Sequence, residues 1–246
     1  MPCLLAVAAT SEIAVACLRR FAGEGWELIL AGRNPAALSA LEKTLREEYP
    51  VCPALSTLYY DVALSAPEQE RFWQSQASHV DAVLIAAGML DDGFSRRDGQ
   101  KALELTYVNY AGLLPLLNSI AQSFEERGHG TLMVISSVAG LRGRASNYVY
   151  GAAKAALNAY LEGLRQRVAC RGVRVMTILP GLIDTRMVAF RNLPAWGVGS
   201  ARGVALDVWC AFRKGKDVVY SPWYYRYLMA LVRILPRFLY LRLKGL

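Results

Sequence analysis

The chain has 246 residues, of which 54% are hydrophobic and 20% charged, so we expect one well-filled domain spanning residues 1–246. Its formal net charge of +8 is compatible with a phosphorylated substrate or an anionic membrane surface. The sequence contains no nucleic-acid-binding motif and no basic strip interleaved with aromatic residues, so nucleic acid is not an expected partner.

The five cysteines are scattered without a CxxC pair, and the two histidines, His79 and His129, lie in polar, turn-like surroundings where we expect them to be exposed. This pattern argues against a disulfide framework and a metal site, and it favours a reducing compartment such as the cytoplasm. The apolar start lacks a basic leader and is interrupted by Glu12, so we interpret it as a strand rather than a signal peptide.

Strand-length apolar runs alternate with helical patterns along the chain. Several runs are apolar at successive residues, which is typical of strands buried on both faces. The expected strands cover residues 3–9, 27–32, 55–61, 82–88, 131–137, 173–180 and 217–221. The expected helices cover residues 11–22, 35–48, 67–76, 101–127, 148–170 and 201–212. This order predicts an α/β fold, a Rossmann-type doubly wound parallel sheet of about seven strands flanked by helices, with ligands beyond the strands' carboxyl ends.

The turn between the first strand and the first helix reads AATSEIA over residues 8–14 and contains no glycine. In folds of this kind a dinucleotide's pyrophosphate binds here, because the N–H groups of the helix N-terminus face the anion. Thr10 and Ser11 can add hydroxyl groups to these donors. Glu12 would repel a bound phosphate, yet an acidic side chain is favourable at a helix start and can point outward. We therefore interpret this turn as a modified nucleotide site that still works.

A second constellation carries groups for proton transfer. Tyr150 and Lys154 are four residues apart on an expected helix, so their side chains share one face. A neighbouring ammonium favours the phenolate and brings the tyrosine pKa toward the neutral range. Ser137 ends the preceding strand and could hold a carbonyl oxygen. Tyr240 and Lys244 repeat the spacing without such a strand before them, so the first pair is the candidate.

With these residues in this order, the sequence resembles the short-chain dehydrogenase/reductase family over nearly its whole length. Ser137 precedes Tyr150 by 13 residues, as in that family, and Asn109 in LTYVNYAG matches the family's fourth catalytic residue. The resemblance implies an NAD(P)-dependent oxidoreductase that moves a hydride between a nicotinamide and a carbonyl or secondary alcohol. It implies that Tyr150 exchanges the proton, Lys154 assists it and holds the ribose, Ser137 orients the carbonyl and Asn109 supports a relay water.

The family's glycine fingerprint TGxxxGxG aligns with residues 7–14, where Ala8, Glu12 and Ala14 replace its glycines. Some members resemble this chain with GATSDI or GGTSEI there, and the alanines are tolerable if their φ angles are negative. The family's NNAG motif is altered to IAAG at residues 85–88. The resemblance implies that a dinucleotide is held by Ala8, Thr10, Ser11, Glu12, Ile13, Arg33, Asn34, Asp61, Val62, Ala87, Gly88, Tyr150, Lys154, Pro180, Gly181, Ile183 and Thr185.

The end of the second strand, AGRN, bears on which dinucleotide is bound. NAD-preferring members carry an acidic residue at the position of Gly32, whereas Arg33 can pair with a 2′-phosphate. We therefore expect NADP(H) to be preferred, with NAD(H) as the alternative. Members of the family are commonly dimers or tetramers, so a homo-oligomer is expected.

The C-terminal segment, residues 222–246, is aromatic, aliphatic and basic, and is expected to form an amphipathic helical extension. Charges and Pro236 interrupt it too often for a membrane span. It can pack on the domain or a sister subunit, or lie as a peripheral helix at the inner membrane surface. The tail, RASNYVYGAAK and PGLIDTRM resemble one subgroup, the decaprenylphosphoryl-2-keto-ribose reductases. This implies a keto group on a lipid-linked phosphosugar as substrate, with its phosphate near Arg142, Arg144 and Arg186.

Two other functions stay open at this point. The absence of glycines from the first turn is also compatible with a non-catalytic dinucleotide sensor that keeps the fold. The tail is also compatible with a membrane-associated interaction subunit in which catalysis is secondary. The complete set of Asn109, Ser137, Tyr150 and Lys154 favours the enzyme.

Overall fold

The computed structural model describes residues 1–90, 95–186 and 197–242. Its centre is a parallel seven-stranded sheet with the order β3-β2-β1-β4-β5-β6-β9. The strands are β1 (Cys3–Val7), β2 (Glu27–Gly32), β3 (Leu55–Tyr59), β4 (Ala82–Ile85), β5 (Gly130–Ile135), β6 (Val173–Pro180) and β9 (Val218–Ser221). The strand order reverses between β1 and β4, so the carboxyl ends of these two strands frame the crevice in which doubly wound folds bind ligands. The predicted fold class is confirmed.

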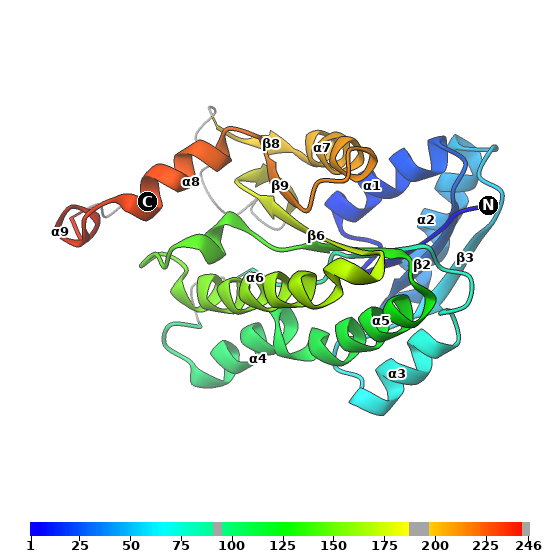
Figure 1. Ribbon diagram of the computed structural model, residues 1–246, viewed down its shortest axis with the longest axis horizontal. Helices are drawn as coiled ribbons and strands as arrows, with labels where there is room; N and C mark the ends of the chain where they lie inside the picture. The colour runs from blue at the N-terminus through cyan, green and yellow to red at the C-terminus, as the bar shows by residue number, and fades with distance from the viewer. Residues whose placement is uncertain (91–94, 187–196, 243–246) are drawn as a thin grey trace.

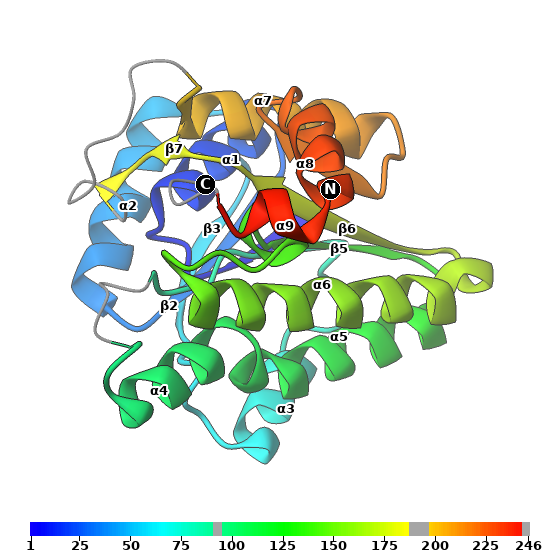
Figure 2. The same cartoon turned by 90° about the vertical axis from the view of Figure 1, so that its left-hand side faces the viewer.

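Helices cover both faces of the sheet, as Figures 1 and 2 show. One layer contains α1 (Glu12–Gly23), α2 (Pro35–Glu48) and α7 (Ala201–Arg213). The other contains α3 (Ala66–Gln74), α4 (Gly99–Asn109), α5 (Leu114–Arg127) and α6 (Tyr148–Val168). Leu5 and Val7 belong to the core under α5 and α6, whereas Leu4 and Ala6 belong to the core under α1 and α7. Successive strand residues face opposite layers, and this explains why the strands are continuously apolar.

The long helix expected over residues 101–127 is wrong: α4 ends at Asn109 and α5 begins at Leu114. Tyr110 leaves the helical conformation with φ −150° and ψ −70°, and a 3-10 turn follows. A Cβ on Gly112 would lie 2.9 Å from the carbonyl oxygen of Val62, so the chain approaches a neighbouring loop there. Pro115, which has no N–H to donate, starts the second helix. The break leaves Asn109 at a helix end beside the crevice.

Several elements end earlier than the sequence indicates. β4 stops at Ile85, so Ala87 and Gly88 lie in the loop beyond the strand, and α6 passes into a 3-10 turn after Val168. The segment after β6 forms a small separate ladder of β7 (Ile183–Asp184) and β8 (Gly199–Ser200).

The C-terminal tail forms α8 (Tyr225–Ile234) and the short α9 (Arg237–Tyr240), which reach out from the body in Figure 1. The buried side of α8 packs with Val138 and Leu179 in a small core of its own. Among the described residues, no helix has both the length and the apolar character that crossing a membrane requires. Lys244 lies outside the described residues.

Candidate active site

A cavity of about 950 Å³ lies at the carboxyl ends of the central strands. Its walls come from the turn before α1, the loops after β4, β5 and β6, the start of α6, and α8. Most of the residues singled out from the sequence line it: Thr10, Ser11, Glu12, Ile13, Ala87, Gly88, Ser137, Arg144, Tyr150, Lys154, Pro180, Gly181, Ile183, Thr185 and Arg186. The fold thus brings together residues from distant parts of the chain.

Tyr150, Lys154 and Ser137 all line this cavity and are each at least nine-tenths buried. The Lys154 Nζ lies 5.9 Å from the centre of the Tyr150 ring and donates a hydrogen bond of 3.4 Å to the carbonyl oxygen of Ile135. The 3-10 turn carrying Ser137 packs on α6 through glycines: a Cβ on Gly140 would lie 2.6 Å from the backbone of Lys154. This close approach packs the turn that follows Ser137 against α6, where Ala139 and Tyr150 share one hydrophobic cluster.

Asn109 is fully buried and holds the loop after β4. Its Nδ2 donates to the carbonyl oxygens of Met89 (2.7 Å) and Leu105 (2.9 Å), and its Oδ1 accepts from the N–H of Met89 (3.3 Å). A Cβ on Gly88 would lie 3.1 Å from the Asn109 Oδ1 and 3.4 Å from the Lys154 Nζ. Asn109 and Lys154 therefore flank Gly88, the small residue that lets both side chains approach the cavity.

Lys154 carries a buried amine, since only 2% of the residue is exposed. Burial lowers the pKa of Lys154 to about 8, because the charged form loses hydration. An amine poised near neutral pH beside a tyrosine ring suits proton exchange. The buried amine also lowers the free energy of unfolding below pH 8, because the native state must then hold a buried charge.

The condition under which the alanines are tolerable, a negative φ, is not met by Ala8, which has φ +57°. The left-handed conformation crowds a Cβ, and this is why glycine suits the position. Ala14 lies inside α1 and is fully buried, so its methyl group is accommodated. The Ser11 Oγ accepts from the N–H of Ala14 at 3.2 Å and caps the helix. The turn therefore keeps the conformation of a glycine turn while carrying an alanine.

We expect Ala8→Gly to raise the free energy of unfolding by about 1 kcal/mol, because glycine adopts a positive φ without crowding. Ala14→Gly is the matched control and should lower it by about 1 kcal/mol, since glycine weakens a helix interior. Urea unfolding of both variants measures the difference. An Ala8→Gly variant that is as stable as the parent or less stable would contradict a strained turn.

Glu12 does not point away into solvent, as the sequence suggested it could. Its carboxylate accepts from the backbone N–H of Arg186 at 2.9 Å and pairs with the Arg186 Nε at 2.8 Å. Arg186, expected near a substrate phosphate, is therefore the partner of an acid in the dinucleotide turn. The ion pair joins segments 174 residues apart.

Arg142 is not placed for a substrate phosphate either. Its guanidinium donates to the carbonyl oxygens of Val232, Arg233 and Leu235 at the end of α8, and stacks 3.9 Å from the centre of the Tyr240 ring. A cation is favourable there because the last carbonyls of a helix lack partners. Arg142 fastens the tail to the body and is not among the residues lining the cavity, whereas Arg144 is.

Sequence reasoning missed the contribution of α8 to the cavity, which is lined by Tyr225, Leu228, Met229 and Val232. The Tyr225 hydroxyl accepts from the N–H of Leu182 (3.1 Å) and donates to the carbonyl oxygen of Gly197 (3.2 Å). A Cβ on Gly181 would lie 2.2 Å from its ring. The spacing of residues 225, 229 and 232 on one helical face was the available signal.

The remaining expected cofactor residues lie outside the cavity lining. Arg33 is exposed just beyond β2. The Asn34 Oδ1 accepts from the N–H of Ala37 at 3.1 Å and caps α2. The Asp61 Oδ1 accepts from the N–H of Ala63, and Val62 is buried in the core. Ala8 is part of the first turn and packs against the core under α5 and α6.

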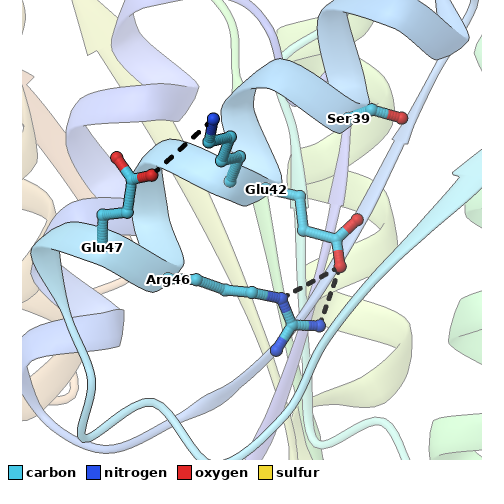
Figure 3. Close-up of a pocket in the computed structure, with 5 residues that line it drawn as sticks. Ser39, Glu42, Arg46 and Glu47 are labelled. Atoms are coloured by element: carbon cyan, nitrogen blue, oxygen red, sulfur yellow. Dashed lines mark hydrogen bonds and ion pairs between the residues drawn. The ribbon is translucent and has the colours of Figure 1, made fainter.

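A smaller hollow of about 410 Å³ lies on the surface of α2, where Glu42 and Glu47 pair with Arg46 and Lys43 (Figure 3). These pairs lie one turn apart on an exposed helix and satisfy one another. None of the residues in this hollow lines the large cavity. Both His79 and His129 are exposed, and the described residues include no cluster that could hold a metal ion.

Comparison with known proteins bears on this site. Residues 3–195 match the family model described as short chain dehydrogenase. The chain belongs to the short-chain dehydrogenase family. An uncharacterized oxidoreductase of Mycobacterium tuberculosis is 33% identical to this short-chain dehydrogenase over 95% of the chain and 93% of its own length. An uncharacterized oxidoreductase of Streptomyces coelicolor is 32% identical over 98% of the chain and 95% of its own length.

Solved structures share the fold of this short-chain dehydrogenase. A short-chain dehydrogenase of Sphingobium yanoikuyae, in complex with NADPH, has a TM-score of 0.83 at 23% identity and covers 96% of this chain and 97% of its own. The bulky-bulky ketone specific alcohol dehydrogenase of Comamonas testosteroni has a TM-score of 0.80 at 22% identity and covers 96% of both chains.

Proposed function

We propose that this short-chain dehydrogenase is an NADP(H)-dependent reductase of a large, mainly apolar carbonyl compound, with Tyr150 as its acid–base. The single observation that carries the proposal is that Ser137, Tyr150 and Lys154 line one cavity of about 950 Å³ that also reaches the first turn. A non-catalytic sensor would need no such set.

The residues present are compatible with a dinucleotide. The N-terminus of α1 offers backbone N–H groups, Thr10 and Ser11 add small hydroxyl groups, and the charge of Glu12 is balanced by Arg186. Pro180, Ile183 and Thr185 line the same cavity. Related folds have been solved with NADPH and NADP, which supports the same ligand class here.

The chain's own groups account for proton transfer. When bound, the nicotinamide supplies or accepts the hydride. Tyr150 donates its hydroxyl proton to the carbonyl oxygen during reduction, and the ammonium of Lys154 stabilises the phenolate that remains. The Ser137 Oγ accepts from the N–H of Ala139 at 3.1 Å, which leaves its hydroxyl hydrogen to donate to the carbonyl oxygen. Asn109 keeps the loop at Gly88 in place for Tyr150 and Ser137.

Arg33 is the proposed determinant of the cofactor choice. We expect calorimetric titration to show NADPH binding about tenfold more tightly than NADH, since a charge-assisted contact to the 2′-phosphate is worth on the order of 1.5 kcal/mol. Arg33→Ser should remove this preference and leave NADH affinity unchanged, so NADH serves as the internal control. Tighter binding of NADH by the unmodified protein would refute the preference, and absence of binding to either would refute the function.

The narrower proposal, a keto group on a lipid-linked phosphosugar, has two supports. Arg144 lines the cavity, and α8 supplies an apolar wall. An outer stripe on the tail, formed by Trp223, Tyr227, Leu231, Ile234, Phe238 and Leu241, is more than half exposed at every position. Arginines 226, 233, 237 and 242 accompany it, and residues 222–242 contain no acidic residue. A helix of this kind is suited to the surface of an anionic bilayer.

Vesicle co-sedimentation tests the outer stripe. We expect the protein to sediment with anionic phospholipid vesicles and to stay in solution with zwitterionic ones. Ile234→Asp combined with Phe238→Asp should abolish sedimentation, because both side chains are exposed and neither lines the cavity. Leu206→Asp, an exposed leucine on α7, is the control and should bind as the parent does. Equal sedimentation of the double variant would contradict lipid contact through this stripe.

A further inference from the structure

The ion pair between Glu12 and Arg186 lies where the proposed function needs phosphate binding. Glu12 is the first residue of α1, at the helix end where N–H groups face an anion, and both side chains line the cavity. A carboxylate at this position repels a pyrophosphate, and a guanidinium attracts it. The two groups are already paired at 2.8 Å. An incoming pyrophosphate therefore competes with Glu12 for the guanidinium of Arg186.

The ion pair between Glu12 and Arg186 is weak. The Arg186 side chain is 84% exposed, and ion pairs that water reaches are weak because both charges are well hydrated when apart. A second contact, from the Arg186 backbone N–H to Glu12, holds the main chain independently of the guanidinium. The side chain of Arg186 can therefore turn away while its backbone stays docked on the turn.

Resting on the proposed dinucleotide function, we propose that Arg186 changes partners when the cofactor binds. Its guanidinium leaves Glu12 and pairs with the pyrophosphate, so Glu12 is an internal competitor that sets the affinity of the site. Glu12, in place of the second glycine, then weakens dinucleotide binding and couples the phosphate end of the site to the segment of β7 and Thr185. Guanidinium groups match phosphate oxygens well, which favours the exchange.

Affinity for NADPH in a double-mutant cycle tests the exchange. Glu12→Gln keeps an oxygen that can accept from the Arg186 N–H but removes the charge, and it should tighten binding about fivefold. Arg186→Gln should weaken binding only slightly in the parent, because there the arginine must first give up Glu12. In the Glu12→Gln background the same change should weaken binding about fivefold, since the full attraction to phosphate is lost.

The sign of this coupling separates exchange from a fixed pair. If Arg186 merely stayed on Glu12 and masked it, Arg186→Gln would weaken binding more in the parent than in the Glu12→Gln background. That result, or equal effects in both backgrounds, would overturn the proposal. Glu24→Gln removes the same charge at the other end of α1, where Glu24 pairs with Arg20 at 2.6 Å, and should leave affinity unchanged.

Thermal unfolding of each variant shows whether the fold is intact. Lower melting temperatures with an unchanged NADPH affinity would mean that the pair is only structural, and would also overturn the exchange. Failure of the parent protein to bind NADPH or NADH is a different outcome, because it refutes the proposed function itself.

Discussion

Tyr150→Phe should lower kcat at least about 100-fold while changing the affinity for NADPH by no more than about threefold. The hydroxyl is the proton donor in the proposed reaction, and a positioned acid–base group contributes on the order of 100- to 10,000-fold to a rate. The phenyl ring that remains keeps the shape of the cavity wall, so binding is little affected. Steady-state reduction of a bulky ketone with NADPH, together with calorimetric titration, measures both quantities.

Tyr148→Phe is a suitable control, since Tyr148 lies on the same helix but is 48% exposed. It should react as the parent protein does. Undiminished turnover of Tyr150→Phe would refute the mechanism. Dinucleotide binding with no Tyr150-dependent turnover of any carbonyl tested would favour the non-catalytic sensor instead.

Lys154→Met should abolish most turnover and yet stabilise the fold at neutral pH. Burial lowers the pKa of Lys154 to about 8 from an ordinary value of 10.5, so the unfolded chain binds its proton more tightly than the native protein does. Below pH 8 the native state holds a buried ammonium, which costs roughly 3 kcal/mol on this scale. Methionine fills a similar volume without the charge.

The gain in free energy of unfolding from Lys154→Met depends on pH. Between about pH 8 and 10.5 the native amine is neutral while the unfolded one is still charged, so the parent gains stability as pH rises through this window. The advantage of Lys154→Met should therefore be largest below pH 8 and shrink toward zero near pH 10.5. Urea unfolding across this range measures it. A variant less stable than the parent at pH 7 would show that the hydrogen bond to Ile135 outweighs the buried charge.

Local sequence patterns determined the inner strands and the placement of the candidate catalytic residues on their elements. Continuous apolar runs such as 3–7 and 82–85 become inner strands, because a strand covered on both faces needs no polar side. The spacing of Tyr150 and Lys154 placed both on one face of α6. Ser137, expected as the last residue of the strand, lies two residues beyond the end of β5 and caps the 3-10 turn that follows. Each of these features depends only on residue type and helical or strand period, and these are visible in a single sequence.

The expected homo-oligomer and the cytoplasmic location stay predictions. So do the individual roles assigned to Asn109, Ser137, Tyr150 and Lys154, although the fold brings them to one end of the sheet.

The tertiary structure alone decided the features that join distant segments. The φ angle of Ala8 depends on how the turn meets β2 and α1, not on the alanine itself. The pairing of Glu12 with Arg186 and the attachment of α8 by Arg142 link residues 90 or more positions apart. The use of α8 as a cavity wall likewise depends on contacts that only the fold creates. The sequence around a charged residue does not reveal its partner, because the partner is whichever opposite charge or free carbonyl group the fold brings within reach.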